Sequence, residues 1–129
     1  MTTTIAPVGD RFAPLARHEF VVLTTYRRDG TAVPTTVWFA NGDGVVYITT
    51  REGSGKLKRI RREGRVELAP SDRVGTLLGE PAVAGRARVG SPGERAGALA
   101  ALAGKYGAQW TRIVGDGGDD PARAYIIVE

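Results

Sequence analysis

Short runs of β-branched and aromatic residues recur along the chain, and clusters of turn-forming residues separate them. Such runs are typical of β-strands, and an Asp-Gly pair such as Asp29-Gly30 is typical of a hairpin turn. The pattern predicts strands over residues 20–25, 32–40, 45–50, 65–69, 82–89 and 124–128. Short strands joined by local turns favour an antiparallel barrel, because closing the sheet removes its exposed edges. A doubly wound parallel sheet would need a long helix after nearly every strand.

Three segments between these strands have features of helices. Residues 10–17 could form a short helix, and residues 56–63 carry inward apolar positions three apart with a glycine after them. A longer helix is predicted to begin after Ser91, which forms a capping-box pattern with Glu94, and to end at Gly107. The expected fold class is mainly β (α+β): an antiparallel barrel of about six strands with two or three short helices.

The composition narrows the kinds of protein that this chain can be. Its 129 residues suit a single domain, 1–129, with a loose tail over residues 1–9. The absence of cysteine and the single histidine, His18, argue against disulfides, thiolate chemistry and a multi-histidine metal site, so no metal is expected. No apolar run approaches the ~20 residues of a membrane span, and the first residues lack a secretory pattern. We therefore expect a cytoplasmic protein with no membrane partner. The net charge of +4 suggests that its binding partner is an anion.

The segment 49–62 combines hydroxyl, glycine and basic residues. Its candidate binding residues are Thr49, Thr50, Ser54, Gly55, Lys56 and Arg59. Loop amides, a serine hydroxyl, a helix N-terminus and a lysine would converge there, as a phosphate requires. Lys56 and Arg59 lie on adjacent helical turns and could share an anion. The same residues also fit an ordinary strand-to-helix turn followed by a solvated helix face, and both interpretations stay open.

The preceding strand carries a second group of candidates, which are Thr35, Thr36, Val37 and Trp38. Consecutive hairpin strands would bring them beside Thr49 and Thr50, so that a planar ring could lie along the strand and bind its backbone. Pro34 has no backbone N–H, and we expect it at a gap in the ladder. The aromatic residues of this strand could equally be ordinary core and surface.

Three stretches, 33–39, 47–50 and 53–70, together resemble a known superfamily. It is the pyridoxamine 5′-phosphate oxidase-like split β-barrel superfamily. Within it, the chain is most similar to the branch of deazaflavin (coenzyme F-420)-dependent enzymes, which Lys105-Tyr106-Gly107 and Gln109-Trp110 also resemble. The resemblance covers residues 12–128.

The resemblance implies where a cofactor would bind. The strand around Thr36, Val37 and Trp38 would touch the flavin or deazaflavin ring, mainly through its backbone. Thr49 and Thr50 would face the ribityl chain. The phosphate would be bound by Ser54, Gly55 and Lys56, with Arg59 as an assistant. Members are typically homodimers with the cofactor at the subunit interface.

The sequence departs from the oxidase itself at two places. Where the oxidase has an arginine at the start of the ring-binding strand and another beside the serine, this chain has Pro34 or Thr35 and Gly55. The departure argues against pyridoxamine phosphate oxidation. It favours coenzyme F-420 over flavin mononucleotide (FMN) as the cofactor, with FMN as the alternative.

The resemblance implies an oxidoreductase that transfers a hydride between reduced coenzyme F-420 and an unidentified small unsaturated molecule. No catalytic side chain is evident, because the chemistry of such enzymes belongs to the cofactor. Tyr47, Tyr106 and Tyr125 are unranked candidates for a proton donor. Two other classes of protein stay open. One is a nucleic-acid-binding barrel, which is disfavoured because few aromatic residues accompany the basic helix. The other is a barrel that binds a tetrapyrrole or lipid without catalysis.

Overall fold

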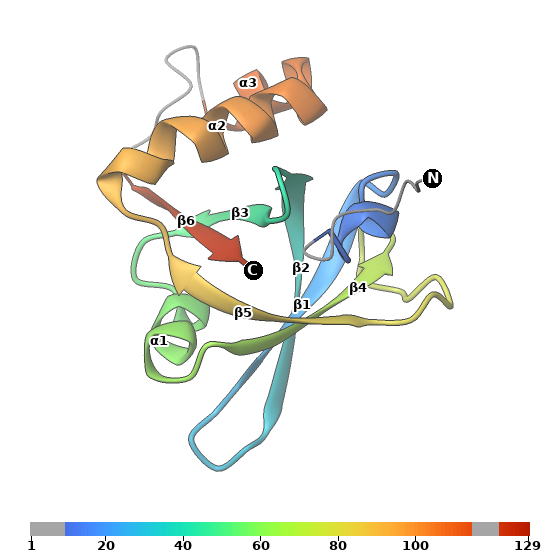
Figure 1. Ribbon diagram of the computed structural model, residues 1–129, viewed down its shortest axis with the longest axis vertical. Coiled ribbons are helices and arrows are strands. Elements are labelled where there is room, and N and C mark those ends of the chain that lie inside the picture. The colour runs from blue at the N-terminus through green and yellow to red at the C-terminus, as the bar shows by residue number, and fades with distance from the viewer. Residues whose placement is uncertain (1–9, 115–121) are drawn as a thin grey trace, which may run out of the picture.

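A computed structural model describes residues 10–114 and 122–129, and these residues form six antiparallel strands closed into a barrel. The strands follow one another around the barrel in the order β1-β2-β3-β6-β5-β4 (Figure 1). Their bounds are β1 Phe20–Tyr26, β2 Ala32–Asn41, β3 Val46–Arg51, β4 Arg65–Ser71, β5 Val83–Val89 and β6 Arg123–Val128. The predicted fold class is therefore confirmed, with each strand displaced by at most two residues at either end. The predicted tail, 1–9, and the loop 115–121 lie outside the described residues.

The helices differ more from the sequence prediction than the strands do. The described helices are the 3-10 turn Ala13–Leu15, α1 Gly55–Arg62, α2 Pro92–Tyr106 and α3 Ala108–Val114. The capping box is confirmed, since the Ser91 amide donates to Glu94 Oε1 at 2.9 Å. The predicted helix 10–17 is wrong in length, because only one 3-10 turn forms there. The sequence analysis missed α3, which begins immediately after Gly107 turns the chain with a φ of 56°.

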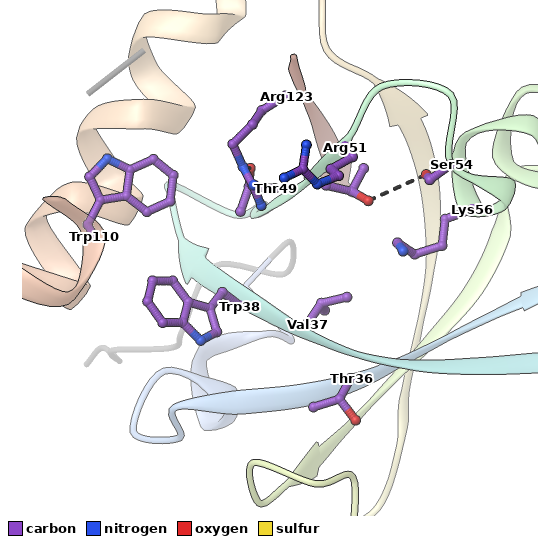
Figure 2. Close-up of a pocket in the computed structure, with 10 residues that line it drawn as sticks. Thr36, Val37, Trp38, Thr49, Arg51, Ser54, Lys56, Trp110 and Arg123 are labelled. Atoms are coloured by element: carbon purple, nitrogen blue, oxygen red, sulfur yellow. Dashed lines mark hydrogen bonds between the residues drawn. The ribbon is translucent and has the colours of Figure 1, made fainter. Parts of the chain in front are cut away.

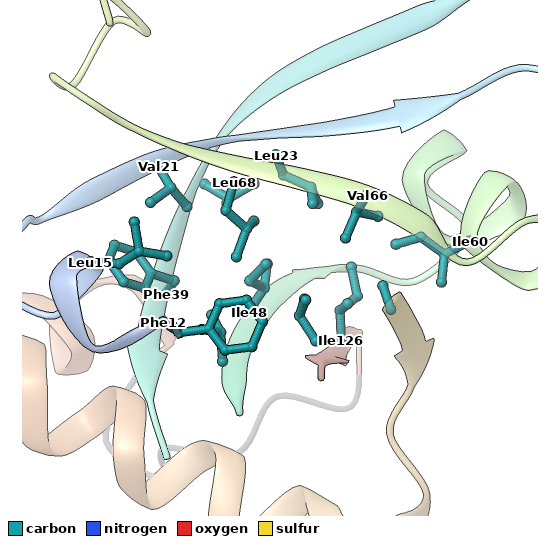
Figure 3. Packing of buried hydrophobic residues seen from close by; sticks show 14 of the residues in the cluster. Phe12, Leu15, Val21, Leu23, Phe39, Ile48, Ile60, Val66, Leu68 and Ile126 are labelled. Carbon is teal, nitrogen blue, oxygen red and sulfur yellow. The ribbon is translucent and has the colours of Figure 1, made fainter. Parts of the chain in front are cut away.

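The barrel interior is filled by one cluster of apolar side chains (Figure 3). Phe12 and Leu15, at the 3-10 turn, belong to this cluster. Leu57 and Ile60 of α1 also pack into it. These four side chains are at most 3% exposed. The three-residue spacing of Leu57 and Ile60 thus puts one face of α1 on the barrel and leaves its basic residues on other faces.

The helix α2 lies outside the barrel and packs on β2 and β3 (Figure 1). Its last residue, Tyr106, stacks on Trp38 with ring centroids 4.2 Å apart. The Phe39 amide donates to the Tyr106 hydroxyl at 3.0 Å, and that hydroxyl lies 2.7 Å from the Glu19 carbonyl oxygen. Tyr106 therefore fastens α2 to the ends of β1 and β2. Within the described residues, no helix is long and apolar enough to cross a membrane.

The strands β2 and β3 separate after a short ladder. They pair only from Phe39–Ile48 to Asn41–Val46, whereas β1 pairs with β2 from Trp38 to Ala32. The Gly42 amide donates to the Val45 carbonyl oxygen, so even-numbered residues of β2 direct their backbone groups toward β3. Pro34 is on that edge and opposite no β3 residue, as its missing N–H requires. The split leaves one edge of β2 without a strand beside it.

Lys105 is a half-buried base near the end of α2. Its Nζ lies 3.4 Å from the centroid of the Phe39 ring, and no hydrogen-bond acceptor among the described residues reaches it. Burial lowers its pKa to about 8, against an opposing effect of Glu19. The face of the Phe39 ring replaces only part of the lost hydration.

We expect the Lys105 environment to make stability depend on pH. Between about pH 8 and pH 9.5, the unfolded chain keeps the lysine proton that the folded protein has released, so the free energy of unfolding should rise with pH. Lys105→Met should be at least as stable at pH 7 and should lack this rise. Urea unfolding of both proteins across this range measures the difference, and parallel curves would contradict it. The pH range of the experiment ends below pH 10. The pKa of the buried Tyr106 hydroxyl is raised, so its titration would lower the free energy of unfolding above that pH.

Candidate functional site

A pocket of about 420 Å³ occupies the place where β2 and β3 separate (Figure 2). We call it the β2–β3 pocket. Its walls come from β2, β3, the loop into α1, α3 and the start of β6. The residues that line it are Thr36, Val37, Trp38, Thr49, Thr50, Arg51, Ser54, Lys56, Trp110 and Arg123. A volume of this size suits a small organic ligand.

Aromatic side chains form one end of the pocket. Trp38 and Trp110 lie together there, with ring centroids 6.4 Å apart and planes inclined by 33° (Figure 2). Trp110 is 2% exposed, and Trp38 is held from behind by Tyr106. The partly exposed indole ring of Trp38, fixed by packing, offers an apolar surface to a planar ligand.

Basic side chains form the other end. Lys56 reaches into the pocket from the start of α1, and Arg51 and Arg123 face each other on paired strands (Figure 2). Like charges directly opposite each other on a sheet destabilise it. Burial lowers the pKa of Lys56, and the charges of Arg59 and Arg123 lower it further. Lys56 and Arg51, with no carboxylate among the described lining residues, make this end suited to an anion.

Hydroxyl groups lie between and beside these cations. Thr49 and Thr50 are buried at the end of β3, and Arg123 Nε donates to Thr49 Oγ1 at 2.9 Å. Ser54 precedes α1 but makes no side-chain cap bond, and its hydroxyl lies 3.4 Å from Thr50 Oγ1. The first amides of α1 have no partner within the helix. Ser54 and these amides are therefore placed to donate to an anion beside Lys56.

The open edge of β2 provides the backbone groups of the pocket. The β2–β3 register, if continued, would place Trp38 opposite Thr49, but no such pair forms. By alternation along the strand, the backbone groups of Thr36 and Trp38 face this opening. The pocket thus offers backbone hydrogen-bonding groups beside its aromatic end.

The structure brings together seven of the ten candidate residues and separates three. Thr36, Val37, Trp38, Thr49, Thr50, Ser54 and Lys56 line the β2–β3 pocket. Thr35 instead lines a groove on the outer face of β1 and β2, and Gly55 and Arg59 line a third pocket beside the β1–β2 turn. Lys56 and Arg59 therefore line different pockets, and their sharing of one anion stays a prediction. Arg59 turns away because its Nε donates to Thr25 Oγ1 at 2.6 Å.

The three candidate proton donors do not line the β2–β3 pocket. The Tyr106 hydroxyl is buried between Glu19 and Phe39, and burial is the main cause that raises its pKa. Tyr47 and Tyr125 pack with Tyr106 around α2. The loop 71–79 contributes Val74, Gly75 and Leu77 to the outer groove and does not line the β2–β3 pocket.

Sequence reasoning gave no site role to Arg51, Trp110 or Arg123. Arg51 directly follows the two threonines and could have been found by extending the strand by one residue. Trp110 was noted only for its resemblance. Arg123 had no local signal, because it meets Thr49 across 74 positions of sequence.

The split antiparallel barrel and its pocket with one aromatic and one basic end define a small split β-barrel protein. The profile of the pyridoxamine 5′-phosphate oxidase family matches residues 11–129, nearly the whole chain. The chain therefore belongs to the pyridoxamine 5′-phosphate oxidase family. No curated protein matches the sequence significantly.

Solved structures share the fold at low sequence identity. General stress protein 26 from Bacillus anthracis is 20% identical, with a TM-score of 0.65 over 95% of this chain and 88% of that one. A conserved hypothetical protein from Mycobacterium tuberculosis is 19% identical, with a TM-score of 0.68 over 99% and 81%. A heme binding protein from Mycobacterium smegmatis is 15% identical, with a TM-score of 0.66 over 97% and 52%. At these identities the likeness concerns the fold alone.

Proposed function

We propose that this protein is an oxidoreductase that transfers a hydride between the deazaflavin coenzyme F-420 and a small unsaturated molecule. The observation that carries the proposal is the division of the β2–β3 pocket into an aromatic end and a basic end. A tricyclic coenzyme with a phosphate-bearing tail has the same two parts. FMN has them as well and is the alternative coenzyme.

Each part of the pocket has a role in binding. Trp38 and Trp110 would contact the ring of the coenzyme. The backbone groups of Thr36 and Trp38, on the open edge of β2, would form hydrogen bonds with polar atoms at the edge of that ring. Ser54 and Lys56 would hold the phosphate. The bound coenzyme would supply the hydride, and the protein would supply proximity and exclusion of water. No tyrosine lines this pocket, so water is the proposed source of the accompanying proton.

The proposal is tested by titrating coenzyme F-420 and FMN separately into the purified protein. Both tryptophans line the pocket, so a bound ring should quench their fluorescence. We expect saturable quenching by at least one coenzyme, with coenzyme F-420 bound more tightly. Failure of both to bind would overturn the oxidoreductase assignment.

Heme is the ligand to compare, because one structural relative is a heme binding protein. His18, the only histidine, is absent from the β2–β3 pocket, and its Nε2 lies 2.7 Å from Glu80 Oε2. No histidine is thus placed to ligate heme iron in this pocket. We expect hemin to produce no defined axial-ligand absorption spectrum.

We also propose that the protein is a homodimer with the coenzyme at the subunit interface. Among the described residues, the exposed large apolar side chains are Val74, Leu77 and Leu78, at 81, 58 and 49%. They lie in the loop after β4, which lines the outer groove of about 510 Å³, and Thr36 lines both this groove and the β2–β3 pocket. A second copy on this face would cover apolar surface next to the coenzyme.

The dimer has a direct test in solution. Light scattering at micromolar concentration should give twice the chain mass of 13.7 kDa. Val74→Asp with Leu77→Asp should give the monomer mass, because it puts two charges into the proposed interface. The exposed substitution Arg61→Asp on α1 is the matched control and should leave the dimer intact. A monomer mass for the unaltered protein would contradict the proposal.

A further inference from the structure

The pocket of about 410 Å³ between the β1–β2 turn and α1 is lined almost entirely by cations. We call it the basic pocket. Its lining residues are Arg27, Arg28, Gly55, Lys58, Arg59 and Arg62. No carboxylate of the described residues lines it, and none of its five basic residues forms an ion pair with a described acidic residue. The folded chain thus concentrates five positive charges around one concavity.

Two of these cations are fixed by contacts with β1. Arg59 Nε donates to Thr25 Oγ1, and Arg62 Nη2 donates to the Tyr26 carbonyl oxygen, both at 2.6 Å. The Arg59 guanidinium also lies over Gly55, where a Cβ atom would come within 2.8 Å of Nη1. Gly55 therefore makes room for a guanidinium that β1 holds in place. A solvated helix face would leave these side chains without such anchors.

The β1–β2 turn holds the other two arginines near α1. The Arg27 amide donates to the Thr31 carbonyl oxygen, and Gly30 closes the turn with a φ of 90°. The Asp29 carboxylate accepts the Thr31 amide at 2.9 Å; hydrogen bonds from Thr31 are the main cause that lowers its pKa, and the charge of Arg27 also lowers it. Burial lowers the pKa of Arg59, and the charge of Arg27 lowers it further. Charges that repel one another in this way favour an anion between them.

We propose that the basic pocket binds a compact polyphosphate group, such as a chain of three linked phosphates. One terminal phosphate carries about 1.5 to 2 negative charges at pH 7 and would leave about three of the five cations unmatched. Linked phosphates match this charge within a short length. A nucleic acid spreads one charge per phosphate along an extended backbone and needs aromatic platforms for its bases, and no aromatic residue lines this pocket. This site is separate from the β2–β3 pocket, so its assignment does not rest on the proposed coenzyme.

Calorimetric titration of inorganic tripolyphosphate into the whole protein tests this site. We expect tripolyphosphate to bind at least about tenfold more tightly than orthophosphate. Arg28→Gln with Lys58→Gln should weaken tripolyphosphate binding at least about tenfold. Both side chains are exposed, and neither is hydrogen-bonded or ion-paired to another element among the described residues. The same double variant should bind FMN and coenzyme F-420 as the unaltered protein does.

Two single variants separate the alternatives. Arg61→Gln removes one exposed charge from the same helix outside the pocket and should change tripolyphosphate affinity by less than about twofold. Lys56→Gln, which alters the β2–β3 pocket, should also have little effect. An equal loss in Arg61→Gln would mean diffuse attraction by net charge, and a loss confined to Lys56→Gln would mean binding in the β2–β3 pocket. Binding of single-stranded RNA but not tripolyphosphate would assign the surface to nucleic acid. Each of these three results would overturn the proposal.

Discussion

Lys56→Ala should weaken coenzyme binding by about 1.5–3 kcal/mol, or roughly 10- to 150-fold in Kd. Lys56 is the cation that α1 directs into the basic end of the β2–β3 pocket, and Ser54 lies beside it. A charge-assisted bond to a phosphate in a half-buried site loses little to solvent screening. Quenching of Trp38 and Trp110 during titration with FMN or coenzyme F-420 measures the change.

The free protein should not be destabilised by this substitution. The pKa of Lys56 is lowered by burial and by Arg59 and Arg123, so the ammonium group costs free energy until an anion arrives. Removing it should leave the free energy of unfolding unchanged or slightly higher. Lys58→Ala is the matched control, since Lys58 lies two residues further on α1 and lines the basic pocket. Equal affinity losses in both variants would contradict a specific contact at Lys56.

Tyr106→Phe should destabilise the fold by about 1–3 kcal/mol, because it leaves a buried backbone donor without its acceptor. The Tyr106 hydroxyl accepts the Phe39 amide at 3.0 Å, and it lies 2.7 Å from the Glu19 carbonyl oxygen. The ring itself would remain stacked on Trp38, so packing should change little. The midpoint of urea unfolding should fall while the dependence on urea concentration stays the same.

Tyr47→Phe is the control for this experiment. Tyr47 belongs to the same apolar cluster as Tyr106, but its hydroxyl makes no hydrogen bond among the described residues. Its loss should change stability by less than about 0.5 kcal/mol. If the two variants were equally stable, Tyr106 would not be the fastening point between α2 and the barrel.

Local sequence patterns were sufficient for the six strands and for α1 and α2. Alternation and turn chemistry located all six strands, and Ser91 with Glu94 located the start of α2, because these signals act over a few neighbouring residues. The helix α3 was missed because Gly107 ends α2 in the expected way and nothing local announces that the chain resumes a helix. The segment 10–17 carried a helical pattern too short to sustain more than one turn.

The candidate site was predicted in part. Two local stretches, 35–38 and 49–59, contain the ten candidate residues, and seven of them line the β2–β3 pocket. Thr35 lies beside Thr36 on β2 and lines the outer groove instead. Cofactor binding by these residues stays a prediction.

The sequence alone determined which segments become the six strands, α1 and α2, and that hydroxyl and basic residues gather where β3 passes into α1. Only the tertiary structure decided that β2 and β3 separate, that Arg123 joins Arg51 opposite Lys56, and that Arg59 turns toward Thr25 and a different pocket. The reason is the separation in sequence over which each interaction acts. Propensity and capping act between neighbours in sequence, whereas the partner of a guanidinium depends on which distant strand the closed barrel places beside it.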